Sequence, residues 1–200
     1  MSKKNRIALI AIVGLLLLVI VFIFVFAFRS CSDSKSTPRP KGYFRIDFPK
    51  EKSYKQYDGE CPFTFEIPEY SFLIKEKEDC WFDIYFPAYK ATIYMTYRSV
   101  NGDIDTLLND AHDFAYKHTI KADAIEENIF AKDSSHVFGC LYNIKGNVAS
   151  QIQFFMTDST SHFIRGSLYF EARPNKDSIA PVVDFIRDDI EHFMESFEWK

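Results

Sequence analysis

The chain has 200 residues, a formal net charge of −4 and 47% hydrophobic residues. This length suits one sizeable hydrophobic core and argues against several domains. The acidic balance argues against nucleic acid as a partner.

A long apolar run follows the basic N-terminus. The run extends from Ile7 to Phe28 without a charged residue. A transmembrane helix needs about 20 apolar residues, whereas the apolar region of a cleaved signal peptide has about 7–15. Residues 1–30 are therefore predicted to be a signal peptide or a membrane anchor. The basic end stays in the cytoplasm, so the rest of the chain is expected to be exported to the periplasm.

Cys31 directly follows this N-terminal segment. Bacterial lipoproteins carry a cysteine at such a position, and it is acylated with fatty acids such as palmitate after cleavage. Ser30 fits the small residue that precedes that cysteine, but Phe28 and Arg29 depart from the pattern. The sequence predicts lipidation at Cys31 and leaves a retained signal anchor open as the alternative. It does not choose between the inner and the outer membrane.

Residues 31–41 combine the lipidation candidate with a polar stretch that contains two prolines. Such a composition is typical of an extended tether. Residues 42–200 are predicted to form a single domain, which begins near Gly42.

Alternation of apolar and polar residues predicts six strands in this domain. They are expected at 63–67, 82–86, 93–97, 138–144, 152–156 and 164–170.

Helical spacing predicts two helices. One is capped by Asp103 or Asp105 and ends near His118. The other is capped by Ser178, has Pro181 in its first turn and presents one apolar stripe to the sheet. Strands, helix, strands and helix in this order indicate an α+β fold with an antiparallel β-sheet and packed helices, and the architecture resembles the PsbP/Mog1-like fold.

The cysteines beyond the tether are Cys61, Cys80 and Cys140. Because Cys61 and Cys80 bracket one short hairpin-like segment, we expect a disulfide between them and a buried thiol at Cys140. Three reduced core cysteines are the alternative. The spacing has no zinc signature, so no metal site is predicted.

The sequence has no catalytic motif, and no cofactor is predicted. Thr157 to His162 contains serine, aspartate and histidine but is typical of a turn between strands. Asp188, Asp189 and His192 are expected on the solvated face of the last helix. A set of aromatic residues falls on the outward strand faces, where either a second helix or a partner must cover them: Trp81, Tyr85, Tyr94, Phe163 and Tyr169.

Several longer segments carry a family resemblance: Pro38 to Asp47, Cys61 to Phe63, Cys80-Trp81, Tyr116 to Asp123, Ile144 to Ser150, Phe155 to Thr160 and Arg173 to Ser178. With these segments the chain resembles the GldD family of gliding-motility lipoproteins. The resemblance implies a component of the gliding machinery that is linked to the type IX secretion system, with no enzymatic activity or cofactor. It supplies no catalytic residues.

Two polar groups are the candidates for contacting a partner. Arg173, Asn175 and Lys176 precede the last helix, and capping by Ser178 or Asp177 does not require them. Lys117, Lys121 and Asp123 form the second group, and loops are where binding residues concentrate. The leading hypothesis is a non-catalytic envelope lipoprotein that contacts other gliding or secretion proteins. The alternative is an envelope domain that binds a small ligand or acts as an enzyme, which a concave pocket would favour.

Overall fold

The computed structural model describes residues 12–24, 42 and 45–200. Residues 12–24 form a helix, and no helix among the described residues is long and apolar enough to cross a membrane. The chain divides into two compact units, 1–43 and 44–200. Cys31, the tether at 31–41 and much of the predicted anchor lie outside the described residues, so these expectations stay predictions.

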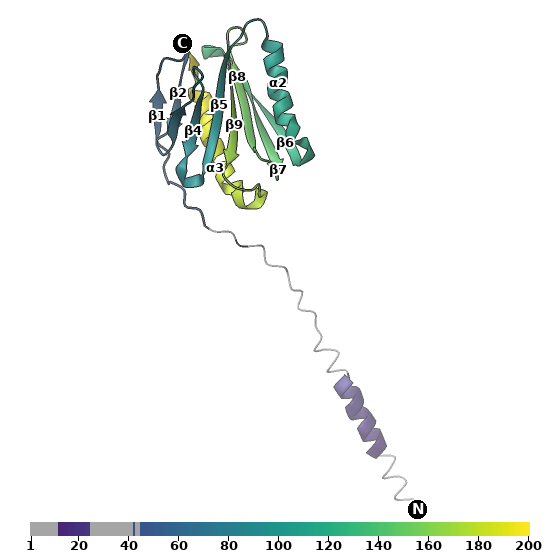
Figure 1. Ribbon diagram of the computed structural model, residues 1–200. Coiled ribbons are helices and arrows are strands. Elements are labelled where there is room, and N and C mark those ends of the chain that lie inside the picture. The colour runs from purple at the N-terminus through teal and green to yellow at the C-terminus, as the bar shows by residue number, and fades with distance from the viewer. Residues whose placement is uncertain (1–11, 25–41, 43–44) are drawn as a thin grey trace, which may run out of the picture. The chain divides into compact units, whose positions relative to one another are not determined.

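The second unit is an α+β domain with two antiparallel sheets (Figure 1). The larger sheet has seven strands in the order β3-β4-β5-β9-β8-β7-β6. Their bounds are β3 Phe72–Lys75, β4 Phe82–Phe86, β5 Ala91–Ser99, β6 Ala122–Lys132, β7 Val137–Gly146, β8 Ile152–Thr157 and β9 His162–Phe170. The smaller sheet has the order β1-β2-β10, with β1 Tyr54–Tyr57, β2 Phe63–Pro68 and β10 Glu198–Trp199.

Two α-helices pack on opposite faces of the larger sheet, α2 Ile104–Tyr116 and α3 Lys176–Ser196. Short 3₁₀ turns cover Pro87–Tyr89, Lys117–Ile120 and Asp133–Ser135. Figure 1 shows α3 behind β5 and β9, and α2 along β6, β7 and β8. The antiparallel α+β class is confirmed, while the PsbP/Mog1 likeness stays a prediction.

The six expected strands are present, and four short or exposed strands were missed: β1, β3, β6 and β10. β7 differs from its expected half-buried pattern. Leu141 faces the main core, but Cys140, Tyr142 and Ile144 are buried on the opposite face, in a second cluster that includes Ala115 of α2. A strand covered on both faces loses the simple inside-outside alternation.

Helix α3 joins the two sheets through its apolar stripe. The Phe193 ring lies 4.8 Å from Phe65 of β2 and 5.7 Å from Phe154 of β8, measured between ring centroids. Gly166 of β9 lies against the Phe154 ring, so closely that a Cβ would stand 2.2 Å from it. The absence of a side chain at this glycine therefore gives Phe154 room to reach the helix.

The start of α3 differs from its prediction. The helix begins at Lys176, and its N-cap is Asn175, whose side chain accepts a hydrogen bond from the backbone N–H of Ser178. Ser178 was the expected cap, but it lies in the first turn. Pro181 consequently lies one turn further inside the helix than expected.

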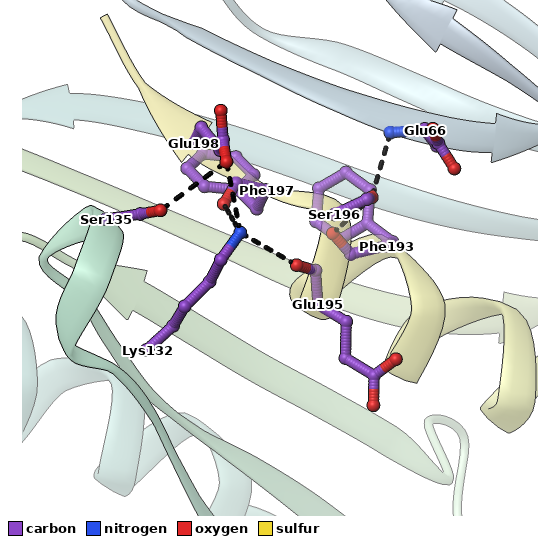
Figure 2. Close-up of polar contacts among 8 residues, drawn as sticks. All are labelled: Glu66, Lys132, Ser135, Phe193, Glu195, Ser196, Phe197 and Glu198. Carbon is purple, nitrogen blue, oxygen red and sulfur yellow. Dashed lines mark hydrogen bonds and ion pairs between the residues drawn. The ribbon is translucent and has the colours of Figure 1, made fainter.

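The C-terminal end of α3 is held by Lys132, the last residue of β6 (Figure 2). Its ammonium group donates to the backbone oxygen of Glu195 at 3.0 Å and to that of Phe197 at 3.4 Å. It also pairs with Glu198 at 3.3 Å. A cation at this end satisfies carbonyls that have no partner within the helix and opposes the negative end of the helix dipole.

Asp189 is buried rather than solvated, which corrects the expectation for the Asp188-Asp189 pair. Its side chain is 2% exposed and accepts hydrogen bonds from Tyr54 at 3.0 Å and Tyr70 at 2.6 Å. Lys52 supplies the counter-charge at 3.0 Å. Burial, together with the nearby Asp189 carboxylate, raises the pKa of both phenols. This network fastens the N-terminal part of the domain to α3.

His192 also makes more contacts than expected for a surface residue. Its ring stacks on Tyr54 at 3.7 Å, and Nε2 lies 2.7 Å from Glu66 of β2. The helix face that was expected to meet solvent therefore meets the smaller sheet.

Phe193→Ala should lower the free energy of unfolding by about 3–5 kcal/mol, because it removes the ring that joins the two sheets and leaves a cavity. Glu195→Ala on the exposed side of α3 should change it by less than about 0.5 kcal/mol. Urea titration of both variants measures the difference. Similar losses in the two variants would show that the buried stripe is misplaced.

Asp189→Asn should destabilise the domain by about 3–5 kcal/mol, because Lys52 would lose the counter-charge of a buried pair. Asp188→Asn is the matched control, since Asp188 is exposed and its contact with Lys52 is longer, at 3.4 Å. Thermal unfolding compares the two. Equal melting temperatures would contradict the burial of Asp189.

Candidate partner-binding surface

Three segments that lie far apart in the sequence meet at one end of the larger sheet. They are the turn and strand start at 117–123, the end of β7 with the β7–β8 connection at 146–151, and the loop before α3 with the first residues of that helix at 171–178. We call this region the loop cluster. Its segments coincide with three of the segments that carried the family resemblance.

Asn147 and Gly146 hold the loop cluster together. The side-chain oxygen of Asn147 accepts from the backbone N–H of Lys176 at 2.9 Å, at the first residue of α3. Gly146 has φ of +126°, and a Cβ there would stand 2.8 Å from the backbone oxygen of Lys121. The close approach therefore needs glycine. The sequence analysis did not select Asn147 as a candidate, although Asn147 lies in the segment Ile144 to Ser150, which carries part of the family resemblance.

Lys176 and Asp123, which were predicted to belong to separate polar groups, form an ion pair. The Lys176 ammonium lies 2.5 Å from the Asp123 carboxylate. The hydrogen bond to Asp123 and its negative charge raise the pKa of Lys176. This contact joins the start of α3 to β6, so both side chains already have a structural partner.

Asn175 caps α3, a role that was expected for Ser178 or Asp177. Lys117 lies over the Phe114 ring at 4.3 Å and thus packs on α2. Among the six partner-contact candidates, Arg173 and Lys121 are exposed and form no side-chain hydrogen bond or ion pair with a described residue. They are the two candidates that remain available to a partner.

Ile120 adds an apolar contact point to the loop cluster. It is 94% exposed and lies between His118 and Lys121. Burial, reinforced by the charge of Arg165, lowers the pKa of His118. Lys121, the next residue in the chain, supplies an exposed positive charge beside Ile120.

The outward aromatic set separates into covered and exposed members. Phe163 is 4% exposed and packs with Leu107 and Ala111 of α2, whereas Tyr94 is 49% exposed. The Tyr94 and Tyr169 rings lie 5.7 Å apart. Trp81 and Tyr85 are half-buried, and the Trp81 indole donates to the backbone oxygen of Tyr97. Helix α2 therefore covers only one part of this face.

A disulfide links Cys61 and Cys80, with 5.6 Å between their Cα atoms, and Cys140 is a buried free thiol. This is the arrangement that the sequence analysis expects. A bridge that closes a loop of this length stabilises a fold by about 3 kcal/mol on the loop-closure model. It holds β2 next to the connection between β3 and β4.

A cleft of about 410 Å³ opens beside this disulfide. Acidic and basic side chains line it: Glu60, Lys75, Glu76, Lys77, Glu78 and Asp79. Nearby Asp83 has its pKa raised to about 6 by burial and by Glu76. Among the described residues that line the cleft there is no serine, threonine or histidine.

The segment around Asp158 forms a turn, as expected. Its carboxylate accepts hydrogen bonds from the backbone N–H groups of Thr160, Ser161 and His162. Burial opposes ionisation, but these bonds outweigh it and lower the pKa of Asp158. His162 turns toward Tyr97, with 2.7 Å between Nδ1 and the hydroxyl, so the residues do not form a catalytic triad. The described residues contain no group of three or more potential metal ligands.

The family model described as gliding motility lipoprotein GldD matches residues 33–199. No curated protein matches the chain. The matched range covers most of the chain and includes all three segments of the loop cluster.

Proposed function

Because the chain belongs to the GldD family of gliding motility lipoproteins, we propose that it supports gliding without catalysing a reaction. In this proposal it is a membrane-anchored envelope protein whose domain lies in the periplasm. It helps to assemble or support the motility and type IX secretion machinery through contacts with other envelope proteins.

The observation that carries the proposal is the construction of the loop cluster. Asn147, Gly146 and the Lys176–Asp123 pair fix three distant segments against each other. The fixed segments present Ile120, Lys121 and Arg173. Ile120 is exposed, and the two basic side chains form no hydrogen bond or ion pair with a described residue. A rigid base with unused exposed side chains loses little conformational entropy on association.

The chemistry of the presented side chains defines the partner surface. Arg173 can bind a carboxylate or two backbone oxygens through its planar guanidinium group. Lys121 adds a point charge, and Ile120 fits a shallow apolar depression. We therefore expect an acidic or carbonyl-rich protein surface with an apolar centre.

A second candidate function is small-ligand binding or enzymatic activity on a PsbP/Mog1-like sheet. The cleft beside the disulfide favours it, since ligand sites are concave. Its polar groups come largely from one charged connection, between β3 and β4. The residues in the lining suit binding of a charged molecule better than nucleophilic chemistry.

Lys121→Glu combined with Arg173→Glu should impair gliding strongly while leaving thermal stability close to that of the unmodified chain, because neither side chain has a partner within the described domain. Arg98→Glu combined with Lys50→Glu makes the same change in charge at exposed positions outside the loop cluster and the cleft. Gliding speed on a surface and the melting temperature are measured for both pairs.

Normal gliding in the stable, normally anchored loop-cluster variant would remove the loop cluster as the contact surface. Equal impairment by both pairs would assign the effect to net charge.

Cys31→Ala should abolish attachment of lipid, because Cys31 is the cysteine next to the apolar run. Metabolic labelling with a fatty acid, followed by purification of the protein, measures it. Continued labelling of the variant, or no labelling of the unmodified chain, would replace lipidation with the signal-anchor alternative. Cys140→Ala is the control and should leave labelling unchanged.

A further inference from the structure

Strand β6 is an unusually long sheet edge. It pairs with β7 on one side, and no strand of the described residues pairs with its other side. It has 11 residues, whereas β3 at the opposite edge has 4. A long edge presents unpaired backbone N–H and C=O groups that can pair with another strand.

Charged residues lie at the middle and at the last position of β6, and they leave an uncharged stretch between them. A bulge lies between Ala122 and Ala124, and Glu126 and Glu127 follow. Lys132 ends the strand. Asn128 to Ala131 is uncharged, and Ile129 within it is 87% exposed. The part of the edge that is free to pair is therefore Asn128–Ala131.

A groove of about 200 Å³ lies beside this stretch, between β6 and α3. Its apolar lining includes Phe130, Leu141 and Met194. Glu191 and Glu195 of α3 line it as well. A strand added to β6 would direct every second side chain toward this groove, because side chains alternate between the faces of a sheet.

Glu191 and Glu195 are two negative charges without a cation partner among the described residues. They are four positions apart on α3, which places like charges next to each other and destabilises a helix by about 0.2–0.5 kcal/mol. Both side chains are exposed, and neither carboxylate pairs with a described cation. Figure 2 shows that Lys132 bonds the backbone oxygen of Glu195, while the carboxylate of Glu195 points away from Lys132. The groove thus combines an apolar lining with unneutralised negative charge.

We propose that an extended segment of a partner protein adds to Asn128–Ala131 as an antiparallel or parallel strand. A lysine or arginine of that segment occupies the groove, with its aliphatic part on Phe130 and Met194 and its charge near Glu191 and Glu195. The neighbouring residue of the segment is apolar and packs beside Ile129. This proposal rests on the proposed function in one respect, which is that the ligand is a protein.

The probe is an acetylated, amidated pentapeptide that alternates lysine and valine, carries a fluorophore and is titrated with the purified full chain in a non-ionic detergent. Fluorescence anisotropy measures the dissociation constant. We expect saturable binding. A peptide with glutamate in place of lysine should bind at least about tenfold more weakly, and a backbone N-methylated peptide should not bind, because it cannot form the ladder of hydrogen bonds.

Variants of the chain test each part of the site. Glu191→Gln with Glu195→Gln should weaken binding roughly three- to tenfold through loss of the ion pairs. Ile129→Lys should abolish binding, because it places a charge on the edge and repels the peptide. Glu51→Gln with Glu69→Gln makes the same change in charge at exposed positions outside the groove, and it should leave the affinity unchanged.

Absence of saturable binding over the whole titration with the chain, or equal binding of the lysine, glutamate and N-methylated peptides, would overturn the proposal. So would self-association of the full chain that Ile129→Lys abolishes, since the occupant would then be a second copy. These measurements detect binding alone. Their failure leaves the role in gliding intact, while that role is tested separately by the loop-cluster variant.

Discussion

The packing of α3 between the two sheets is the constraint on which the domain depends. Phe193 contacts Phe65 on one side and Phe154 on the other. Without α3, the apolar face of each sheet would be exposed to solvent. The helix packs on both faces and so completes a shared core. The helix is fixed at both ends, by Asn175 and Asn147 at its start and by Lys132 at its end. Both candidate interaction surfaces therefore adjoin an end or an edge of this rigid element.

The buried Asp189 network connects this core to the N-terminal part of the domain. Lys52 contacts Asp189 and also donates to the backbone oxygen of Phe185 at 2.8 Å. Phe48 stacks on the Phe185 ring at 4.6 Å. These contacts hold the first described residues of the domain on α3.

The two proposed contact regions differ in charge. The loop cluster presents Lys121 and Arg173, while the groove beside β6 presents Glu191 and Glu195. Opposite charges on separate regions allow one domain to distinguish two partner surfaces, because each region repels the partner of the other.

The sequence by itself determined the α+β class, the buried stripe of α3 and the expected pairing of Cys61 with Cys80, since these follow from periodicity and local spacing. It did not determine the cap, because Asn175, Asp177 and Ser178 can all cap a helix. Nor could it place Asp189, whose burial depends on Tyr54, Tyr70 and Lys52, more than 100 positions away. Strand β6 lacks regular alternation because it lies at an edge. The tertiary structure decided these features, since contacts between distant segments, and not local patterns, determine which polar residues are buried and which edges stay open.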